Sequence, residues 1–493
     1  MTPDQLRDHL AEKYDIVCFE PLAEYNQDSS AIYKIFHQLY QESYEPTQRL
    51  VFWTSTTPTR KLINHLKHAA DVIDISQCFI LICGPTSNYQ VESIEFFNVA
   101  IDAPAMQTDS LLSLDRFCPL PFFHLAIMTQ GSAKACCVSK KYFGSATTTS
   151  VKDLFFSDYM KDLRHKFTSG QRATDCSNCW NLEDRNIKSN RQWHLDLYQH
   201  RFFTENWMDD LKVRSLDYRP SNVCNFKCRI CVPVSSSLLA EEAYRFSDSE
   251  EDKTKIKSIM IKGRWFDDNP EFFQQITKMM QDMVQIDFYG GEPFLLKQLP
   301  TLLEQAISSD VAKNIRLHFN TNGSVWRNSI IDSLSRFKEV DISISVDNID
   351  RAFELERGGT WQQIENNISK FVKLGKPFCI SIMPTVNIQN IYYLPDLIEW
   401  AQKSNTRIVF NYLDFPECFN IDYMTTEAKQ LVVDRFLQYD HPELKKLIDR
   451  IVQSPGSDGK LFVEQTKLYD QYRKQDFRST HKEIAEAMGY VLN

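Results

Sequence analysis

Three cysteines stand close together in the stretch VCNFKCRICVP, residues 223–233. Cys224, Cys228 and Cys231 have the spacing C-x3-C-x2-C, which is typical of thiolates that bind zinc or an iron–sulfur cluster. A structural zinc ion takes four protein ligands, and no further Cys or His lies close by in the sequence. Three thiolates on a four-iron cluster leave one iron open, which is useful when that iron must bind another group.

A second set of cysteines precedes the first. Cys118, Gly131 and Cys136 follow the pattern C-x12-G-x4-C, and Cys176 and Cys179 form a C-x2-C pair. Four soft ligands in two pairs suit either zinc or an iron–sulfur cluster, so the spacing alone does not choose between them.

A pair of glycines follows an apolar stretch in QIDFYGGEP, residues 285–293. The chain has only 14 glycines, so adjacent ones indicate a place where the backbone needs an unusual conformation or a close approach. Taken alone, the motif could also be an ordinary turn before a helix that has Pro293 at its first position.

The cysteine loop and the glycine pair together resemble the radical S-adenosylmethionine (SAM) superfamily. The resemblance implies a 4Fe–4S cluster on Cys224, Cys228 and Cys231, whose open iron chelates the amino and carboxylate groups of SAM. An electron from the cluster then yields a 5′-deoxyadenosyl radical that abstracts a substrate hydrogen. Gly290, Gly291, Glu292 and Pro293 match the family's GGEP motif, which contacts the methionine part of SAM. One departure is Ile230, since the residue before the third cysteine is often aromatic in the family.

The resemblance also implies SAM contacts from later strand ends. FNTNGS (319–324) supplies Asn320, with Thr321 and Asn322 beside it, and SISVD supplies Ser345 and Asp347. Arg357 would reach the SAM carboxylate, and Asn387 would meet the ribose. An ordinary surface or capping role is the alternative for each of these side chains. No catalytic acid, base or radical acceptor is predicted.

The second cysteine set resembles the twitch domain, the shortened relative of the SPASM domain of radical SAM enzymes. The resemblance implies an auxiliary iron–sulfur cluster, of the 4Fe–4S type, on Cys118, Cys136, Cys176 and Cys179. The family spacing favours Cys136 over its neighbour Cys137. Zinc and structural thiols are the alternatives. Twitch domains more often follow the barrel, whereas this one precedes it.

The elements that must position these residues alternate between strands and helices. From about residue 211 to 415, six apolar strands are separated by helical stretches, which is typical of parallel βαβ units. We therefore predict a partial (β/α)6 TIM-like barrel of the α/β class, with functional residues at the carboxyl ends of its strands. The predicted domains are an extra α/β Rossmann-like domain, a twitch-like domain, the barrel and a C-terminal helical region, over 1–110, 111–204, 205–420 and 421–493.

The composition bounds the setting and the partners. A net charge of −9 argues against binding to nucleic acid. No long apolar run occurs, so we expect that the chain has no membrane span and no secretory signal. Thirteen cysteines without such a signal fit a reducing cytoplasm. The expected partners are a substrate and an electron donor such as flavodoxin or ferredoxin.

The predicted function is that of a radical SAM enzyme that modifies a peptide or protein. The alternative is a dehydrogenase or rearrangement enzyme acting on a small molecule, such as a sugar or a nucleotide. A minor alternative is a non-catalytic iron–sulfur sensor or scaffold.

Overall fold

The computed structural model describes residues 115–490 except 186, 205–206 and 268, together with the backbone of four strands nearer the N-terminus. The chain divides into two units. Residues 1–119, 167–171 and 186–211 form the first, and the remaining residues form the second. Among the described residues, no helix is long and apolar enough to cross a membrane.

The first unit contains a four-stranded sheet of order β1-β2-β3-β4. Strands β1, β2 and β3 are parallel and β4 is antiparallel to β3, and the apolar runs YDIVCF, QRLVFW and CFILIC predict the first three of them. The helices that SSAIYKIFHQLYQESY and TRKLINHLKHAA predict between these strands lie outside the described residues. The element bounds are Ile16–Pro21, Arg49–Thr54, Cys78–Ile82 and Phe97–Asn98 for the strands, and Asn190–Thr204 for helix α7.

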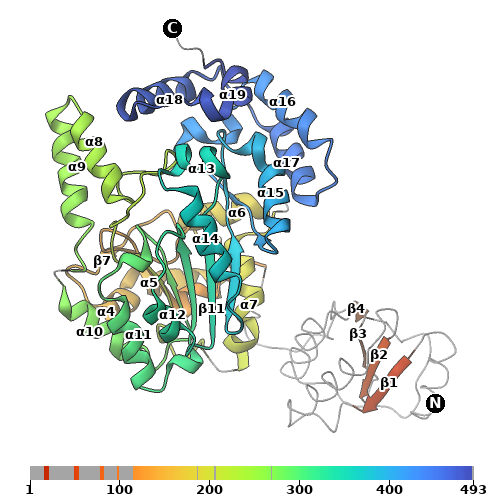
Figure 1. Cartoon of the computed structure of the whole chain (residues 1–493). Coiled ribbons are helices and arrows are strands. Elements are labelled where there is room, and N and C mark those ends of the chain that lie inside the picture. Colours follow the sequence, from red (N-terminus) through yellow and green to blue (C-terminus); the bar gives the residue numbers. More distant parts are fainter. Residues whose placement is uncertain are drawn as a thin grey trace. The chain divides into compact units, whose positions relative to one another are not determined.

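The second unit is organised around a nine-stranded sheet of order β14-β12-β11-β10-β9-β8-β5-β6-β7 (Figure 1). Its six strands from β8 to β14 are all parallel, so the predicted partial (β/α)6 barrel is confirmed. Their bounds are Ser215–Tyr218 (β8), Gln285–Phe288 (β9), Arg316–Thr321 (β10), Glu339–Ile344 (β11), Phe378–Ile382 (β12) and Arg407–Ile408 (β14).

Amphipathic helices follow the strands and cover the sheet. Helix α10 begins where the side chain of Asn269 accepts a hydrogen bond from the N–H of Phe272, with Pro270 in the first turn. Phe319 of β10 stacks on Phe288 of β9, with ring centroids 4.7 Å apart. The helix bounds are Ser237–Phe246 (α8), Glu250–Lys262 (α9), Pro270–Met279 (α10), Leu299–Ser308 (α11), Asn328–Leu334 (α12), Asp350–Arg357 (α13), Trp361–Phe371 (α14) and Leu394–Lys403 (α15).

The sheet of the barrel continues into the segment that carries the second cysteine set. Strand β5 pairs in parallel with β8, and β6 and β7 follow in antiparallel order. The stretch RFCPLPFFHLAIMTQGSAKACC predicts a strand pair around a glycine turn, and β5 and β6 form it. Gly131 has a positive φ of 78°. The bounds are His124–Ile127 (β5), Ser132–Lys134 (β6), Gly144–Ser145 (β7), Val151–Phe155 (α4), Asp158–Thr168 (α5) and Ser177–Glu183 (α6).

The C-terminal region is helical, as predicted. The stretch QSPGSDGK predicts a loop between two helices, and residues 454 to 459 join α17 to α18 there. The bounds are Thr426–Phe436 (α16), Pro442–Gln453 (α17), Lys460–Arg473 (α18) and Arg478–Ala487 (α19). A small parallel pair is formed by β13 (Thr385–Val386) and β15 (Asn411–Tyr412). Short 3-10 turns lie at Leu120–Phe122, Thr174–Cys176, Pro293–Leu295, Ala312–Asn314, Ile391–Tyr393, Glu417–Phe419 and Ile421–Tyr423.

Candidate active site and iron–sulfur sites

A cavity of about 750 Å³ opens at the carboxyl ends of the barrel strands. It brings together residues that follow β5, β8, β9 and β11 with residues at the end of β10. The predicted site residues that line it are Cys224, Cys228, Cys231, Gly290, Gly291, Asn320, Ser345 and Arg357. This is the end of the sheet at which the sequence predicts functional residues.

The three cysteines of residues 223–233, called here the cluster loop, all face this cavity. The loop is fixed where helix α8 begins, because the Ser236 hydroxyl donates to the carbonyl of Phe226 at 2.7 Å. The N–H of Cys231 donates to the carbonyl of Cys228 at 3.0 Å, which closes a tight turn between the second and third thiols. The sequence therefore folds locally so that three thiols converge on one space.

Burial makes these thiols poor acids in the metal-free protein. It raises the pKa of Cys224 and of Cys231 to about 12 each, and the nearby guanidinium of Arg357 opposes that rise in both cases. Thiolates, not thiols, bind iron, so a metal must displace protons from this loop when it binds.

The GGEP turn lies directly against the cluster loop. Gly290 and Gly291 have positive φ values of 78° and 57°. A Cβ atom at Gly291 would lie 2.3 Å from the carbonyl oxygen of Val223, so only glycine fits there. The N–H of Gly291 donates to the carbonyl of Ser235 at 3.2 Å, and that of Glu292 donates to the carbonyl of Val223 at 2.8 Å.

The side chain of Glu292 is buried and already fully bonded within the protein. Its carboxylate accepts from the Thr321 hydroxyl and from the N–H of Asn322, each at 2.7 Å, and from the N–H of Phe294 at 3.2 Å. It does not line the cavity, and neither does Pro293. Glu292 thus ties the GGEP turn to the end of β10, and its contact with the SAM ammonium stays a prediction.

Two further predicted residues lie behind the cavity wall. Asp347 pairs with Arg357 and accepts a hydrogen bond from the N–H of Thr385 at 2.7 Å. Asn387 is fully buried, and its amide donates to the carbonyl of Thr385 at 2.8 Å. Of these four residues, Thr385 and Arg357 line the cavity. The sequence did not single out Thr385.

The residues at the cavity fit a cluster and an anionic ligand. Three thiols share one wall, as a three-cysteine cluster requires. The Nε atom of Arg357 is buried and has no hydrogen-bond partner among the described residues, which leaves a charged donor for a carboxylate at the cavity. Arg357 and the three thiols are therefore the residues that would hold the two groups.

Three cysteines of the second set, Cys136, Cys176 and Cys179, lie near one another. Burial raises the pKa of Cys136 to about 12, and Cys176 and Cys179 raise it further because their thiolates would be like charges nearby. Two contacts join their segments, from Asn178 Nδ2 to the carbonyl of Val138 at 2.9 Å and from the N–H of Lys140 to the carbonyl of Asp175 at 2.9 Å.

The remaining thiols of this set differ in their surroundings. The pKa of Cys137 is raised by burial and then by the Asp217 carboxylate on β8, so this thiol faces the barrel strands. Cys118 is buried in the first unit. The ligand assignment to Cys118, Cys136, Cys176 and Cys179 stays a prediction.

Acidic and basic side chains form a layer inside the barrel below the cavity. In the strand register, Asp217 of β8 stands opposite Asp287 of β9, and Asp287 stands opposite His318 of β10. Arg219 is bonded to both oxygens of Asp217, at 3.1 and 3.0 Å, and its guanidinium lies 5.1 Å from the ring centroid of Tyr289. Arg219 and Tyr289 line the cavity.

Burial raises the pKa of Asp287 to about 7, and a hydrogen bond from Gln285 opposes the shift. Because the folded pKa lies above the ordinary value, the free energy of unfolding should fall as the pH rises from about 4 to about 7. An Asp287→Asn variant removes this ionisation and can keep the bond from Gln285. We expect it to be more stable than the wild type at pH 8 by a few kcal/mol, since one pKa unit corresponds to about 1.4 kcal/mol.

Denaturant unfolding of both proteins at pH 5 and pH 8 measures this effect. The advantage of the Asp287→Asn variant should shrink towards pH 5, where Asp287 is protonated in the folded wild type. An equal difference at both pH values would show that Asp287 does not titrate in this range.

Sequence reasoning missed the wall that β5, β6 and β8 provide. Met128, Thr129, Gln130, Ser132, Tyr142 and Arg219 line the cavity, together with Phe226, residues 234–236, Tyr289 and Thr385. Thr321 and Asn322, which the sequence did single out, line it as well. Arg219 could have been identified from the sequence, because it lies at the end of the first barrel strand in the stretch SLDYRP. Met128, Thr129 and Gln130, which follow β5, reach the cavity through the parallel pairing of β5 with β8, two strands about 90 residues apart in the chain.

Comparisons with protein families agree with the geometry. A model of the radical SAM superfamily matches residues 218–401, and a model of an iron–sulfur cluster-binding domain, SPASM, matches residues 118–180. Iron–sulfur clusters and SAM are therefore the cofactors of the chain.

Individual relatives are distant. The sporulation killing factor maturation protein SkfB of Bacillus subtilis is 25% identical over 236 residues, which are 45% of this chain and 50% of SkfB. The GTP 3′,8-cyclase of Clostridium botulinum is 24% identical over 185 residues, which are 36% of this chain and 51% of the cyclase. The matches thus span about half the length of these curated relatives.

A solved structure with a similar chain is that of Streptococcus suis SuiB bound to S-adenosylmethionine. It is 15% identical, with a TM-score of 0.31, and the match covers 63% of this chain and 64% of SuiB.

Proposed function

We propose that this radical SAM protein, which also carries a SPASM domain, uses a 5′-deoxyadenosyl radical to abstract hydrogen from a peptide or protein and so modifies it. The observation that carries the proposal is a cavity that the three thiols share with Ser132 of β6 and with polar residues that follow β5 and β8. A substrate in that cavity would lie against the cluster loop and against the segment that the SPASM model matches.

The cluster and SAM, when bound, supply reductive cleavage of the C5′–S bond and hence the radical. The side chains of this chain do the remaining work. Cys224, Cys228 and Cys231 would hold the iron, and the buried guanidinium of Arg357 would orient the carboxylate of SAM. Gly290 and Gly291 would let the backbone approach the ligand. The other SAM contacts that we propose, from the family resemblance, are Glu292, Pro293, Asn320, Ser345, Asp347 and Asn387. The barrel walls would exclude water from the reacting atoms.

The part of the wall formed by Met128, Thr129, Gln130, Tyr142 and Arg219 would face the substrate. Arg219 is held by Asp217 through Nε and Nη2, and its Nη1 makes no hydrogen bond to any residue that the structure describes. A rigidly held arginine with a remaining donor suits a carbonyl or a carboxylate of the substrate. Arg219 would therefore orient the substrate rather than take part in the radical step.

A peptide is favoured because one relative is named for maturation of a sporulation killing factor. The second candidate is a nucleotide or another small molecule, since another relative is a GTP 3′,8-cyclase. Arg219 also suits a phosphate, so the cavity alone fits both substrate classes. Flavodoxin or ferredoxin would supply the electron, and the cytoplasm is the proposed compartment.

The test uses the full-length protein, reconstituted anaerobically with iron and sulfide. SAM and dithionite are added, and 5′-deoxyadenosine is measured by mass spectrometry. Two pools from the source cells, small peptides and nucleotides with sugars, are then added separately. We expect the peptide pool to stimulate 5′-deoxyadenosine formation and to contain a product of altered mass. Stimulation by the small-molecule pool alone would select the second candidate, and no 5′-deoxyadenosine at all would leave a sensor or scaffold.

An Arg219→Gln variant separates substrate orientation from SAM cleavage. A hydrogen bond from a charged group contributes about 1.5–3 kcal/mol, so we expect about a 10- to 100-fold loss of substrate-stimulated turnover. Iron content and 5′-deoxyadenosine formation without substrate should stay close to wild type. An Arg219→Lys variant, which keeps the charge, should lose less.

Arg316→Gln is the matched control. Arg316 also pairs with an aspartate, Asp341, and is similarly half-buried, but it does not line the cavity. If it has the same effect as Arg219→Gln, the loss reflects damage to the barrel and not a lost substrate contact.

A further inference from the structure

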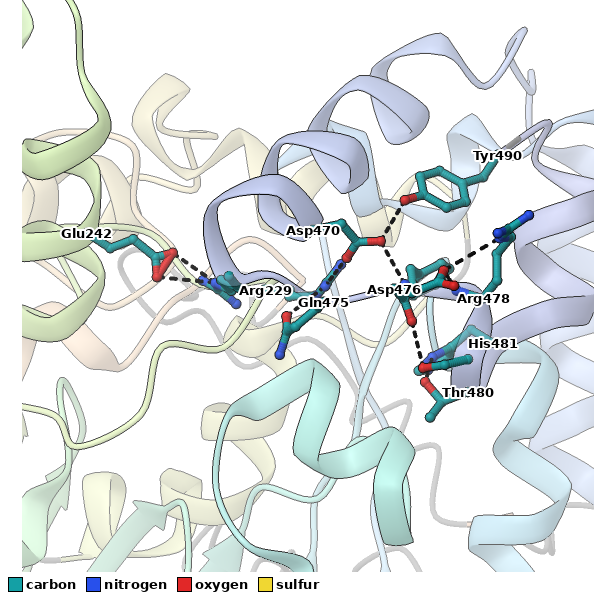
Figure 2. A network of polar contacts seen from close by, with 12 residues as sticks. Arg229, Glu242, Asp470, Gln475, Asp476, Arg478, Thr480, His481 and Tyr490 are labelled. Carbon is teal, nitrogen blue, oxygen red and sulfur yellow. Dashed lines mark hydrogen bonds and ion pairs between the residues drawn. The ribbon is translucent and has the colours of Figure 1, made fainter. Parts of the chain in front are cut away.

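The C-terminal helices reach the back of the cluster loop. Arg229 lies between the second and third cysteines of that loop, and its side chain is fully buried. Its Nη2 atom pairs with Asp470 of α18 and donates to the Gln475 side chain at 2.8 Å (Figure 2). The rings of Tyr469 and Phe477 flank its guanidinium, with centroids 5.8 and 5.6 Å away.

The carboxylate that holds Arg229 is itself fixed from the end of the chain. The second oxygen of Asp470 accepts a hydrogen bond from the Tyr490 hydroxyl at 2.6 Å and another from the N–H of Phe477 at 2.7 Å. Figure 2 shows Asp470 between Arg229 and Tyr490. Tyr490 is buried, so its hydroxyl is directed by packing as well as by this bond. The position of Arg229 is thus set by residues about 240 to 260 positions later in the chain.

The same helices also hold α13, the helix that ends at Arg357. The N–H of Arg229 donates to the carbonyl of Glu356 at 2.7 Å. The carboxylate of Glu356 contacts Nε2 of His481 on α19 at 2.6 Å and accepts from the Asn348 amide at 3.0 Å. Arg357 follows Glu356 directly and lines the cavity. These contacts therefore connect the cluster loop with α13, the helix that carries Arg357.

A third link uses Glu242 of α8. Its carboxylate pairs with Lys227 of the cluster loop at 2.9 Å and with Arg473 of α18 at 2.8 Å. The cluster loop contains no helix or strand of its own, so these side-chain contacts limit the conformations that it can adopt.

We propose that residues 460–490 position the cluster loop. Through Arg229 and Glu356 they fix the position of the three thiols relative to Arg357. Arg229 is a positioning residue, because it acts through the loop and touches neither substrate nor the reacting atoms. A planar guanidinium bonded on one side and stacked between two rings fixes an orientation that an apolar side chain of similar size would not fix. The proposal concerns loading of the loop and does not depend on which substrate is modified.

The test compares Arg229→Met, Arg229→Lys and Tyr490→Phe with wild type, all as the full chain. Iron and sulfide are measured after anaerobic reconstitution, and EPR spectra of the reduced protein are recorded with and without SAM. We expect Arg229→Met to keep the iron of the auxiliary site, about four atoms per chain. The iron occupancy of its cluster loop should fall at least five-fold. Arg229→Lys should recover part of that occupancy.

Tyr490→Phe removes one hydroxyl and keeps the ring, so it tests the proposal if Arg229→Met does not fold. We expect it to load iron normally but to need about five-fold more SAM to change the EPR spectrum. Arg450→Met is the matched control. Arg450 of α17 is bonded to Asp422 at 3.1 and 3.0 Å, and it contacts neither the loop nor α13. It should have wild-type iron content and SAM response.

Two results would overturn the proposal. One is full loop occupancy with an unchanged SAM response in both Arg229→Met and Tyr490→Phe. The other is loss of iron from both sites in equal proportion, which would mean that the C-terminal helices only stabilise the fold. Both readouts remain informative if the wild type forms no 5′-deoxyadenosine, so they are independent of the proposed function.

Discussion

Replacing Cys224, Cys228 and Cys231 together by alanine is expected to lower the iron content from about eight to about four atoms per chain and to abolish 5′-deoxyadenosine formation. The reason is that these three residues are the cysteines that line the cavity among the described residues. Anaerobic iron and sulfide analysis with EPR on both proteins measures the effect.

Cys418→Ala is the control for this experiment, because Cys418 lies in the short turn Glu417–Phe419 and does not line the cavity. It should leave the iron content unchanged. If the triple variant instead loses all its iron, residues 118–180 hold no cluster of their own. The protein would then have one cluster, and the second cysteine set would be structural or bind zinc.

Gly291→Ala is expected to destabilise the protein by about 3 kcal/mol and to raise the SAM dissociation constant about ten-fold or more. Two costs add. The positive φ of 57° disfavours any side chain, and the new Cβ would meet the Val223 carbonyl oxygen at 2.3 Å. Backbone of the cluster loop would have to move, so the loss of SAM binding should accompany the loss of stability. Thermal unfolding and SAM titration measure the two effects.

Gly375→Ala is the matched control, since a Cβ atom at Gly375 would meet nothing within 4 Å. It should change stability by less than about 1 kcal/mol and leave SAM binding unchanged. Equal effects of the two substitutions would contradict the view that the GGEP turn rests on the cluster loop.

The barrel could be predicted from the sequence because its strands are short apolar runs that end in turn signals and alternate with amphipathic helices. Six such runs became six parallel strands, in the predicted order. Local pattern is enough for this, because each strand and the helix after it lie close together in the chain. The same holds for the three cysteines of the cluster loop, which occupy eight consecutive positions.

The side-chain partners of the site could not be predicted in this way. The family motif suggested Glu292 and Asn387 as ligand contacts, but their polar atoms bond to protein groups that only the folded strand ends bring near. Arg229 is an ordinary loop residue in the sequence, and its partner Asp470 lies 241 positions away. Charge pairs of that separation leave no periodic signal.

The pairing of β5 with β8 has a consequence for how the protein can be divided. A partial barrel ends in strands whose outer N–H and C=O groups are unpaired, and such edges promote aggregation. On the β8 side that edge is covered by β5, β6 and β7, which come from the segment that the SPASM model matches. A fragment beginning at residue 205 would expose the inner strand β8, so a truncated barrel should precipitate where the longer chain stays dispersed. The barrel therefore depends on residues 124–145 to cover its β8 edge.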